Sequence, residues 1–140
     1  MGDVRAEKKC VVVVDGDLPV GLLANTATVL AITLGSRVGS IVGDDAVDGS
    51  GEVHPGLTRL PIPILKANAD ALKEIRLKAS GTEDLLVVDF TDAAQTPRDY
   101  GEYLENISGV PTEDLRYLGV ALYGDKRPVN KLTGGLPLLR

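Results

Sequence analysis

One run of residues constrains the fold more than any other: Lys9 is followed by Cys10 and by four consecutive valines, residues 11–14. Successive side chains of a β-strand point to opposite faces, so an uninterrupted apolar run indicates a strand that is covered on both faces. We therefore expect a central strand in a sheet that lies between layers of helices. Residues 84–90 and 115–123 contain similar runs, and they predict a second interior strand and a fourth strand.

Segments with helical periodicity lie between these strands. Residues 21–35 carry leucines and alanines at helical spacing, residues 66–79 are amphipathic, and residues 97–107 follow a capping-box pattern that starts at Thr96. The last of these helices is expected to bury Tyr100, Tyr103, Leu104 and Ile107. Strands that alternate with helices predict one α/β domain over residues 1–140, with a sheet that is at least partly parallel.

The remaining segments are extended or rich in turn residues. Residues 37–43 are a further short strand candidate. Residues 44–56 contain Asp-Gly-Ser-Gly and His-Pro-Gly, which predict a hairpin tip or an exposed loop. Two prolines in residues 60–65 favour an extended segment at a sheet edge. Residues 124–140 form a basic tail rich in glycine and proline.

Composition argues against several classes of protein. The chain has 15 basic and 20 acidic side chains, a net charge of −5, so binding to a nucleic acid is not expected. Its only cysteine is Cys10, which excludes an intramolecular disulfide and a zinc site of several thiolates, and fits a reducing compartment. Residues 1–9 lack the apolar core of a signal peptide, and polar residues interrupt the uncharged run 18–36, which we interpret as a buried helix. We expect a cytoplasmic protein without a membrane span.

Ligands of open α/β sheets gather at the carboxyl ends of strands, so residues that follow the apolar runs are candidates. Three such ends are residues 15–17, 89–92 and 124–127. Paired carboxylates there could bind a divalent cation or act as acid and base. Short acidic residues also form Asx turns and cap the next helix. We expect this structural role for Asp15, and both roles remain open for Asp17 and Asp89.

Polar side chains in the first helix form a second group of candidates. Asn25 and Thr28 share one side of the helix and are expected to line a cleft. The hydroxyls of Thr26 and Thr33 are instead expected to bond to backbone carbonyls one turn earlier. Thr91, close to Asp89, could orient a ligand. The ligand-binding candidates are therefore Asp17, Asn25, Thr28, Asp89 and Thr91.

Other residues with reactive side chains favour structural roles. His54 is expected to be a solvated loop residue, Cys10 a core thiol, and Gly134-Gly135 a tight turn. Neither a phosphate-binding glycine pattern nor a common hydrolase signature is present in the sequence. We expect no metal and no cofactor.

Several segments carry a resemblance to known families. Val-Val-Asp-Gly-Asp-Leu at residues 13–18 precedes an alanine-rich helix, Ile-Leu-Lys at 64–66 leads into the amphipathic helix, and Val88-Asp89 and residues 118–122 follow. In this order they resemble the type II peptidyl-tRNA hydrolase fold. The chain is also similar to a family described as a domain of unknown function, number two thousand in its series, in Asp-Leu-Pro at 17–19 and in residues 132–140.

The resemblance implies an α/β fold with a mixed, mainly parallel four-stranded sheet flanked by helices. It matches Asp17 and Asp89 to acidic residues near the hydrolase active site. The hydrolases carry Lys, Gln and His on the first helix, whereas residues 22–26 here are Leu-Leu-Ala-Asn-Thr. Ala93 replaces a threonine expected four residues after the site aspartate, although Thr91 is near. Cations for phosphate and a base for the ester are therefore missing from the matching positions.

These observations favour a ligand- or protein-binding domain without peptidyl-tRNA hydrolase activity, whose partner is an unknown small molecule or protein. A hydrolase or transferase that uses Asp17 and Asp89 is an alternative. A third possibility is a structural homo-oligomer, such as a homodimer, built through a valine-rich sheet edge or through the apolar tail, residues 136–139.

Overall fold

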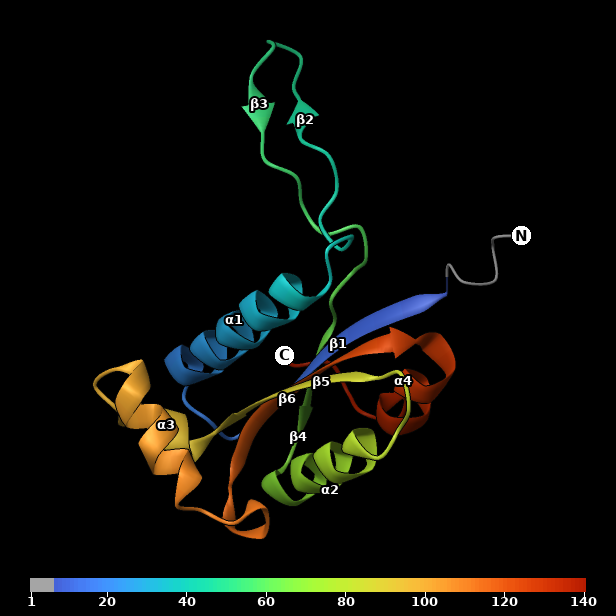
Figure 1. The fold of residues 1–140 in the computed structure, drawn as a ribbon. Helices are drawn as coiled ribbons and strands as arrows, with labels where there is room; N and C mark the ends of the chain where they lie inside the picture. The colour runs from blue at the N-terminus through green and yellow to red at the C-terminus, as the bar shows by residue number, and fades with distance from the viewer. Residues whose placement is uncertain (1–6) are drawn as a thin grey trace.

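In the computed structural model, which describes residues 7–140, the valine run forms an interior strand (Figure 1). This strand, β1 (Lys8–Asp15), belongs to a four-stranded sheet of order β4-β1-β6-β5. The other strands are β4 (Ile64–Ala67), β5 (Leu86–Thr91) and β6 (Tyr117–Asp125). Six consecutive residues of β1 are buried, so the predicted central strand is confirmed. Residues 1–6, for which the sequence analysis expected no signal peptide, lie outside the described residues.

The directions of the strands correct the expected topology. β1 runs parallel to β4, but β6 runs antiparallel to both β1 and β5. The sheet is therefore mixed, and the expectation of a mainly parallel sheet is wrong because the segment between β5 and β6 returns the chain antiparallel. β5 is an edge strand, not an interior one. The end of β6 lies beside the beginning of β1, where Asp125 pairs with Lys8.

Helices cover both faces of the sheet, which explains the apolar side chains at successive positions of β1. The α1 helix (Val20–Arg37) lies on the face that includes Cys10, Val12 and Val14. The α2 helix (Ala69–Ser80) and the α4 helix (Lys126–Thr133) lie on the opposite face, with Val11 and Val13. Figure 1 shows the sheet between α1 on one side and α2 and α4 on the other.

The α1 helix is less buried than its apolar sequence suggests. Only the stripe of Thr26, Leu30 and Leu34 is buried, and Val20 and Ile32 are exposed on the outer face. The prediction of a buried helix is therefore wrong for that outer face, because α1 forms an outer layer that no other part of residues 7–140 covers. By length and composition alone, α1 is apolar enough to cross a membrane.

The segment between α1 and β4 projects from the body as a long arm (Figure 1). Residues 44–56 form the predicted hairpin, with the short strands β2 (Ala46–Val47) and β3 (Val53–His54). The predicted strand over residues 37–43 is wrong, since it reduces to one bridge between Val42 and Thr58. The extended edge segment predicted from two prolines is confirmed by the position of β4.

Four short helices in residues 92–133 differ wholly or in part from the sequence predictions. The β5–β6 connection contains η2 (Asp92–Ala94), α3 (Tyr100–Ser108) and η3 (Thr112–Asp114). The N-cap of α3 is Asp99 rather than Thr96, and Tyr100 is 71% exposed, so the prediction that α3 buries this ring is wrong. Leu104 is exposed as well. The sequence did not predict α4, whose eight residues lie within the supposed tail.

The last residues complete the open edge of β4. Leu138 bridges to Leu65, and the backbone amide of Leu139 donates to the carbonyl of Ile64 at 2.8 Å. Leu136 and Leu139 pack against the core. This apolar tail is therefore used within the chain, which leaves little of it for the oligomer contact that we considered from the sequence.

Candidate functional site

The carboxyl ends of β1 and β4 meet at a point where the chain turns to opposite faces of the sheet. The two strands are parallel neighbours, and β1 leads to α1 on one face while β4 leads to α2 on the other. Diverging connections of this kind open a crevice at the strand ends, which is where open α/β sheets bind ligands. Asp17 and Asn68 stand at the beginnings of these two connections.

A cavity of about 310 Å³ occupies this crevice. Its lining is formed by Gly16, Asp17, Lys66, Ala67, Asn68 and Pro137. The backbone amide of Gly16 donates to the carbonyl of Ala67 at 3.1 Å, which ties the end of β1 to the end of β4. A Cβ atom at Gly16 would lie 3.2 Å from Cβ of Lys66, so the absence of a side chain permits this close approach. The tail contributes Pro137, whose carbonyl accepts from the amide of Lys66 at 3.0 Å.

Two turns fix the polar side chains of this site. The buried carboxylate of Asp15 accepts a hydrogen bond from the amide of Asp17 at 3.0 Å, which is the predicted Asx turn. The expected capping of α1 by these aspartates is wrong, because the N-cap is Pro19 and no side chain bonds to the first turn. At the other strand, Oδ1 of Asn68 accepts from the amide of Ala71 at 2.8 Å and caps α2.

The site presents groups of both charges to one cavity. Within residues 7–140, neither the carboxylate of Asp17 nor the ammonium group of Lys66 has an ion-pair partner. The side-chain amide of Asn68 uses its oxygen for the cap and retains two N–H donors. The cavity can therefore offer an anion, a cation and a neutral donor to a small polar molecule.

Asp89 and Thr91 lie apart from Asp17. Asp89 forms an ion pair with Arg76 of α2, with Nε and Oδ2 3.3 Å apart, on the α2 face of the sheet. Thr91 is buried, and its hydroxyl caps η2 by accepting from the amide of Ala93 at 3.3 Å. β6 lies between β1 and β5, so these two strands are roughly 10 Å apart, or two inter-strand spacings. Asp89 is level with Val13 across β6, whereas Asp17 follows the end of β1. The structure does not bring Asp17 and Asp89 together as an acid and base pair.

Thr26 and Thr28 of α1 both differ from the roles that we expected. Thr28 is exposed, and its hydroxyl donates to the carbonyl of Ala24 at 2.8 Å. Thr26 is buried, and its hydroxyl has no hydrogen-bond partner among the described residues. Asn25 is exposed on the outer face of α1 and does not line the cavity at the strand ends. Thr28 does not line it either.

The other residues that we considered from the sequence make contacts typical of structural residues. Cys10 is buried, and burial raises the pKa of its thiol to about 11, so the thiolate is scarce at neutral pH. His54 contacts Asp48 in the arm, at 2.9 Å between Nε2 and Oδ2. Gly134 ends α4. Residues 7–140 contain no group of three or more His, Cys, Asp or Glu side chains that could hold a metal ion.

A comparison with protein families decides what kind of chain this is. The model of a family described as "Protein of unknown function (DUF2000)" matches residues 8–140. The chain belongs to this family. No curated protein matches the sequence. A solved structure, titled as a protein of unknown function from Agrobacterium tumefaciens str. C58, is similar with a TM-score of 0.87 and 23% sequence identity.

That similarity covers 94% of this chain and 97% of the other. It extends over the whole α/β domain, so this DUF2000 member and the bacterial protein share a fold. Identity at this level supports the fold alone. The cavity between β1 and β4 therefore has to be interpreted from its own side chains.

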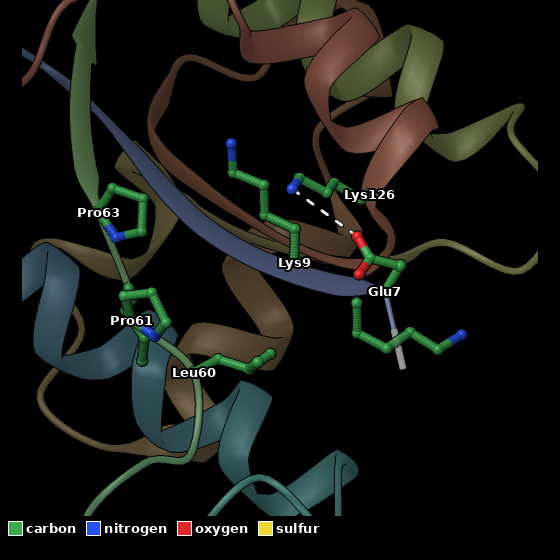
Figure 2. A pocket seen from close by; sticks show the side chains of 8 residues that line it. Glu7, Lys9, Leu60, Pro61, Pro63 and Lys126 are labelled. Atoms are coloured by element: carbon green, nitrogen blue, oxygen red, sulfur yellow. Dashed lines mark ion pairs between the residues drawn. The ribbon is translucent and has the colours of Figure 1, made fainter. Parts of the chain in front are cut away.

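A larger cavity of about 650 Å³ lies at the opposite end of the strands in this DUF2000 protein, where β1 begins and β6 ends (Figure 2). It is formed where β1 and β6 meet the proline-flanked segment before β4. Three lysines line it, with Glu7 and an apolar strip: Lys8, Lys9, Lys126, Leu60, Pro61, Ile62 and Pro63. Nζ of Lys9 donates to Asn130 at 2.6 Å, and Nζ of Lys126 lies 3.7 Å from Glu7. The sequence analysis missed this site, although the basic tail was a signal for it.

Proposed function

We propose that this DUF2000 member is a binding domain for a small polar molecule, held in the cavity between the ends of β1 and β4. The observation that carries this proposal is the convergence of Asp17, Lys66 and Asn68 on one cavity at the point where the connections diverge. Groups of this kind fix the orientation of small ligands in α/β proteins. The separation of Asp17 from Asp89 argues against the alternative of a hydrolase or transferase that uses both carboxylates.

The charges of the site suggest a class of ligand. The Asp17 carboxylate suits a cationic group, while the Lys66 ammonium group and the Asn68 amide suit a carboxylate or carbonyl oxygen. A cavity of about 310 Å³ has room for a small molecule. A zwitterion such as a free amino acid satisfies both charges at once. We therefore favour this class over a ligand with a single charge.

The first expected result is binding of zwitterions in preference to singly charged analogues. Isothermal titration with free amino acids, matched amines and matched carboxylates measures this preference. Asp17→Asn and Lys66→Met should each weaken binding by roughly 10- to 100-fold, since a hydrogen bond to a charged group contributes about 1.5–3 kcal/mol. Glu105→Gln, a change on the exposed surface of α3, is the matched control and should leave affinity unchanged. Equal affinity of wild type and both site variants would contradict the proposed site.

We also propose kinship with the type II peptidyl-tRNA hydrolase fold, without its activity. The support is the order of the elements, with a mixed sheet and with helices α1 and α2 on opposite faces. From Val20 to Ser36, α1 carries no charged residue, so it offers no cation for a phosphate and no histidine as a base. The fold is compatible with a role other than hydrolysis.

The second expected result is therefore negative. Purified protein incubated with peptidyl-tRNA should release tRNA no faster than buffer, because α1 lacks both a cation and a general base from Val20 to Ser36. A type II hydrolase in the same assay is the positive control. Release above the buffer rate that is lost in Asp89→Asn would show that the chain is a hydrolase, and it would overturn this proposal.

A further inference from the structure

The arm carries a surface that nothing in residues 7–140 covers. Its strands β2 and β3 pair only with each other in the described part of the chain. Val47 and Val53 face each other across the two strands and are 67% and 62% exposed. Isolated two-stranded ribbons are marginally stable in water. An arm of this kind is therefore expected to rest on another surface.

The charge of the arm limits what that surface can be. Residues 38–58 include Asp44, Asp45, Asp48 and Glu52, and they contain no lysine or arginine. All four acidic residues are exposed. A surface that binds the arm must therefore be basic, and it must also offer apolar contacts to the two valines.

The larger cavity, at the end of the sheet where β1 begins, offers both positive charge and apolar contacts. Lys8 pairs with Asp125, and Lys126 pairs with Glu7, which also lines the cavity, so the excess positive charge of the lining comes from Lys9, which binds the uncharged Asn130. Residues 60–63 supply the apolar strip. Arg127 and Lys131 of α4 extend the basic surface, and both are exposed. Figure 2 shows Lys9 and Lys126 on one side of the cavity, with Leu60, Pro61 and Pro63 on the other. We call this surface the basic groove.

The arm and the basic groove lie next to each other in one chain. The arm returns to the body through residues 57–63, and the last four of these form one wall of the groove. Figure 1 shows the arm extending away from the body, so it does not fill the groove of its own chain. Each chain therefore carries both an acidic arm and an adjacent basic groove. Two copies related by a two-fold axis can each place their arm in the groove of the other.

We propose that two copies of this chain form a dimer in which each acidic arm lies in the basic groove of the other. In this dimer the arms run antiparallel, and the two contacts form together. From its base at residue 43 to its tip at residue 49, each arm reaches roughly 20 Å at about 3.3 Å per residue, enough to cross to the groove at the base of the partner's arm. The contact does not involve the cavity between β1 and β4, so it is independent of the proposed ligand.

Charge reversal on the full-length chain tests this dimer. One variant reverses the arm from four negative charges to a net charge of +2 (Asp44→Lys, Asp45→Lys and Glu52→Lys) and keeps Asp48, whose carboxylate accepts two backbone hydrogen bonds in the turn. The other variant reverses the groove (Lys9→Glu with Lys126→Glu). Each variant alone opposes like charges at both contacts, whereas a mixture pairs a basic arm with an acidic groove and an acidic arm with a basic groove. Sedimentation velocity at tens of micromolar and low salt should show a dimer for wild type, monomers for each variant, and a heterodimer for the mixture. Raised salt should weaken the wild-type dimer.

Two outcomes would overturn the proposal. One is a wild-type monomer under these conditions. The other is a dimer that survives both reversals, which would place the contact elsewhere, for instance on the outer face of α1. Circular dichroism melts of the two variants check that the body remains folded, and recovery of a heterodimer on mixing would itself show that both variants are folded.

Discussion

Replacing Gly119 by alanine is expected to destabilise the domain by about 1–3 kcal/mol, the usual range for overpacking a close-packed core. Gly119 lies in β6 between β1 and β5, beneath α1. A Cβ atom there would lie 2.6 Å from Cγ2 of Thr26 and 3.2 Å from the carbonyl oxygen of Val13. The backbone of β1 cannot move without breaking the sheet, so α1 must shift. Gly119→Val should cost more. Urea denaturation measures the change in the free energy of unfolding.

Two further variants separate this contact from a general effect of glycine replacement. Gly35→Ala in α1 is the matched control, because no atom lies within 4 Å of the added Cβ. It should be neutral or stabilising by up to about 1 kcal/mol, since alanine favours a helix more than glycine does. Thr26→Ser removes the methyl group that alanine would meet, so it should recover part of the loss in the double variant. Equal losses in Gly119→Ala with and without Thr26→Ser would contradict the proposed clash.

The Thr26–Gly119 contact also shows which parts of the fold the sequence could predict. Periodicity identified the strand at residues 9–14 and the first two helices, because the spacing of the apolar residues in each segment fits one type of element and not the other. The antiparallel direction of β6 depends on the path of the chain between Thr91 and Tyr117, and periodicity carries no information on that path. The α4 helix was missed because glycines and prolines surround its eight residues.

The candidate site was predictable only in part, for a related reason. The rule that ligands gather at strand ends selected Asp17, which lines the cavity. Lys66 and Asn68 join it because β4 lies parallel to β1, a pairing between residues about fifty positions apart in the sequence. The same rule also selected residues 124–127, but the antiparallel direction of β6 places them at the opposite end of the strands, beside the beginning of β1. There they border the basic groove, a site that the sequence analysis did not predict.

Removing the side chain of Arg116 is expected to destabilise the domain through the buried carboxylate of Asp15. This aspartate ends β1, and its side chain is only 3% exposed, whereas that of Arg116 is 58% exposed. Nη2 of Arg116 lies 3.3 Å from Oδ2 of Asp15. Arg116→Met leaves a buried charge whose one remaining bond comes from the amide of Asp17. Because water can reach part of this site, we expect a loss of about 1–3 kcal/mol, less than for a fully buried pair.

Asp15 is buried and Arg116 is largely exposed, so removing the charge of Asp15 tests whether Arg116 acts through that charge. Urea denaturation again measures the free energy of unfolding. Asp15→Asn keeps an oxygen that can accept from Asp17 but carries no charge, so it does not need the guanidinium group. Arg116→Met should therefore cost less in the Asp15→Asn background than in wild type, and the difference measures the coupling. Lys78→Met, which breaks the exposed ion pair with Glu74 in α2, is the matched control and should change stability by less than about 1 kcal/mol. Equal losses for Arg116→Met in both backgrounds would mean that Arg116 acts through its packing and not through its charge.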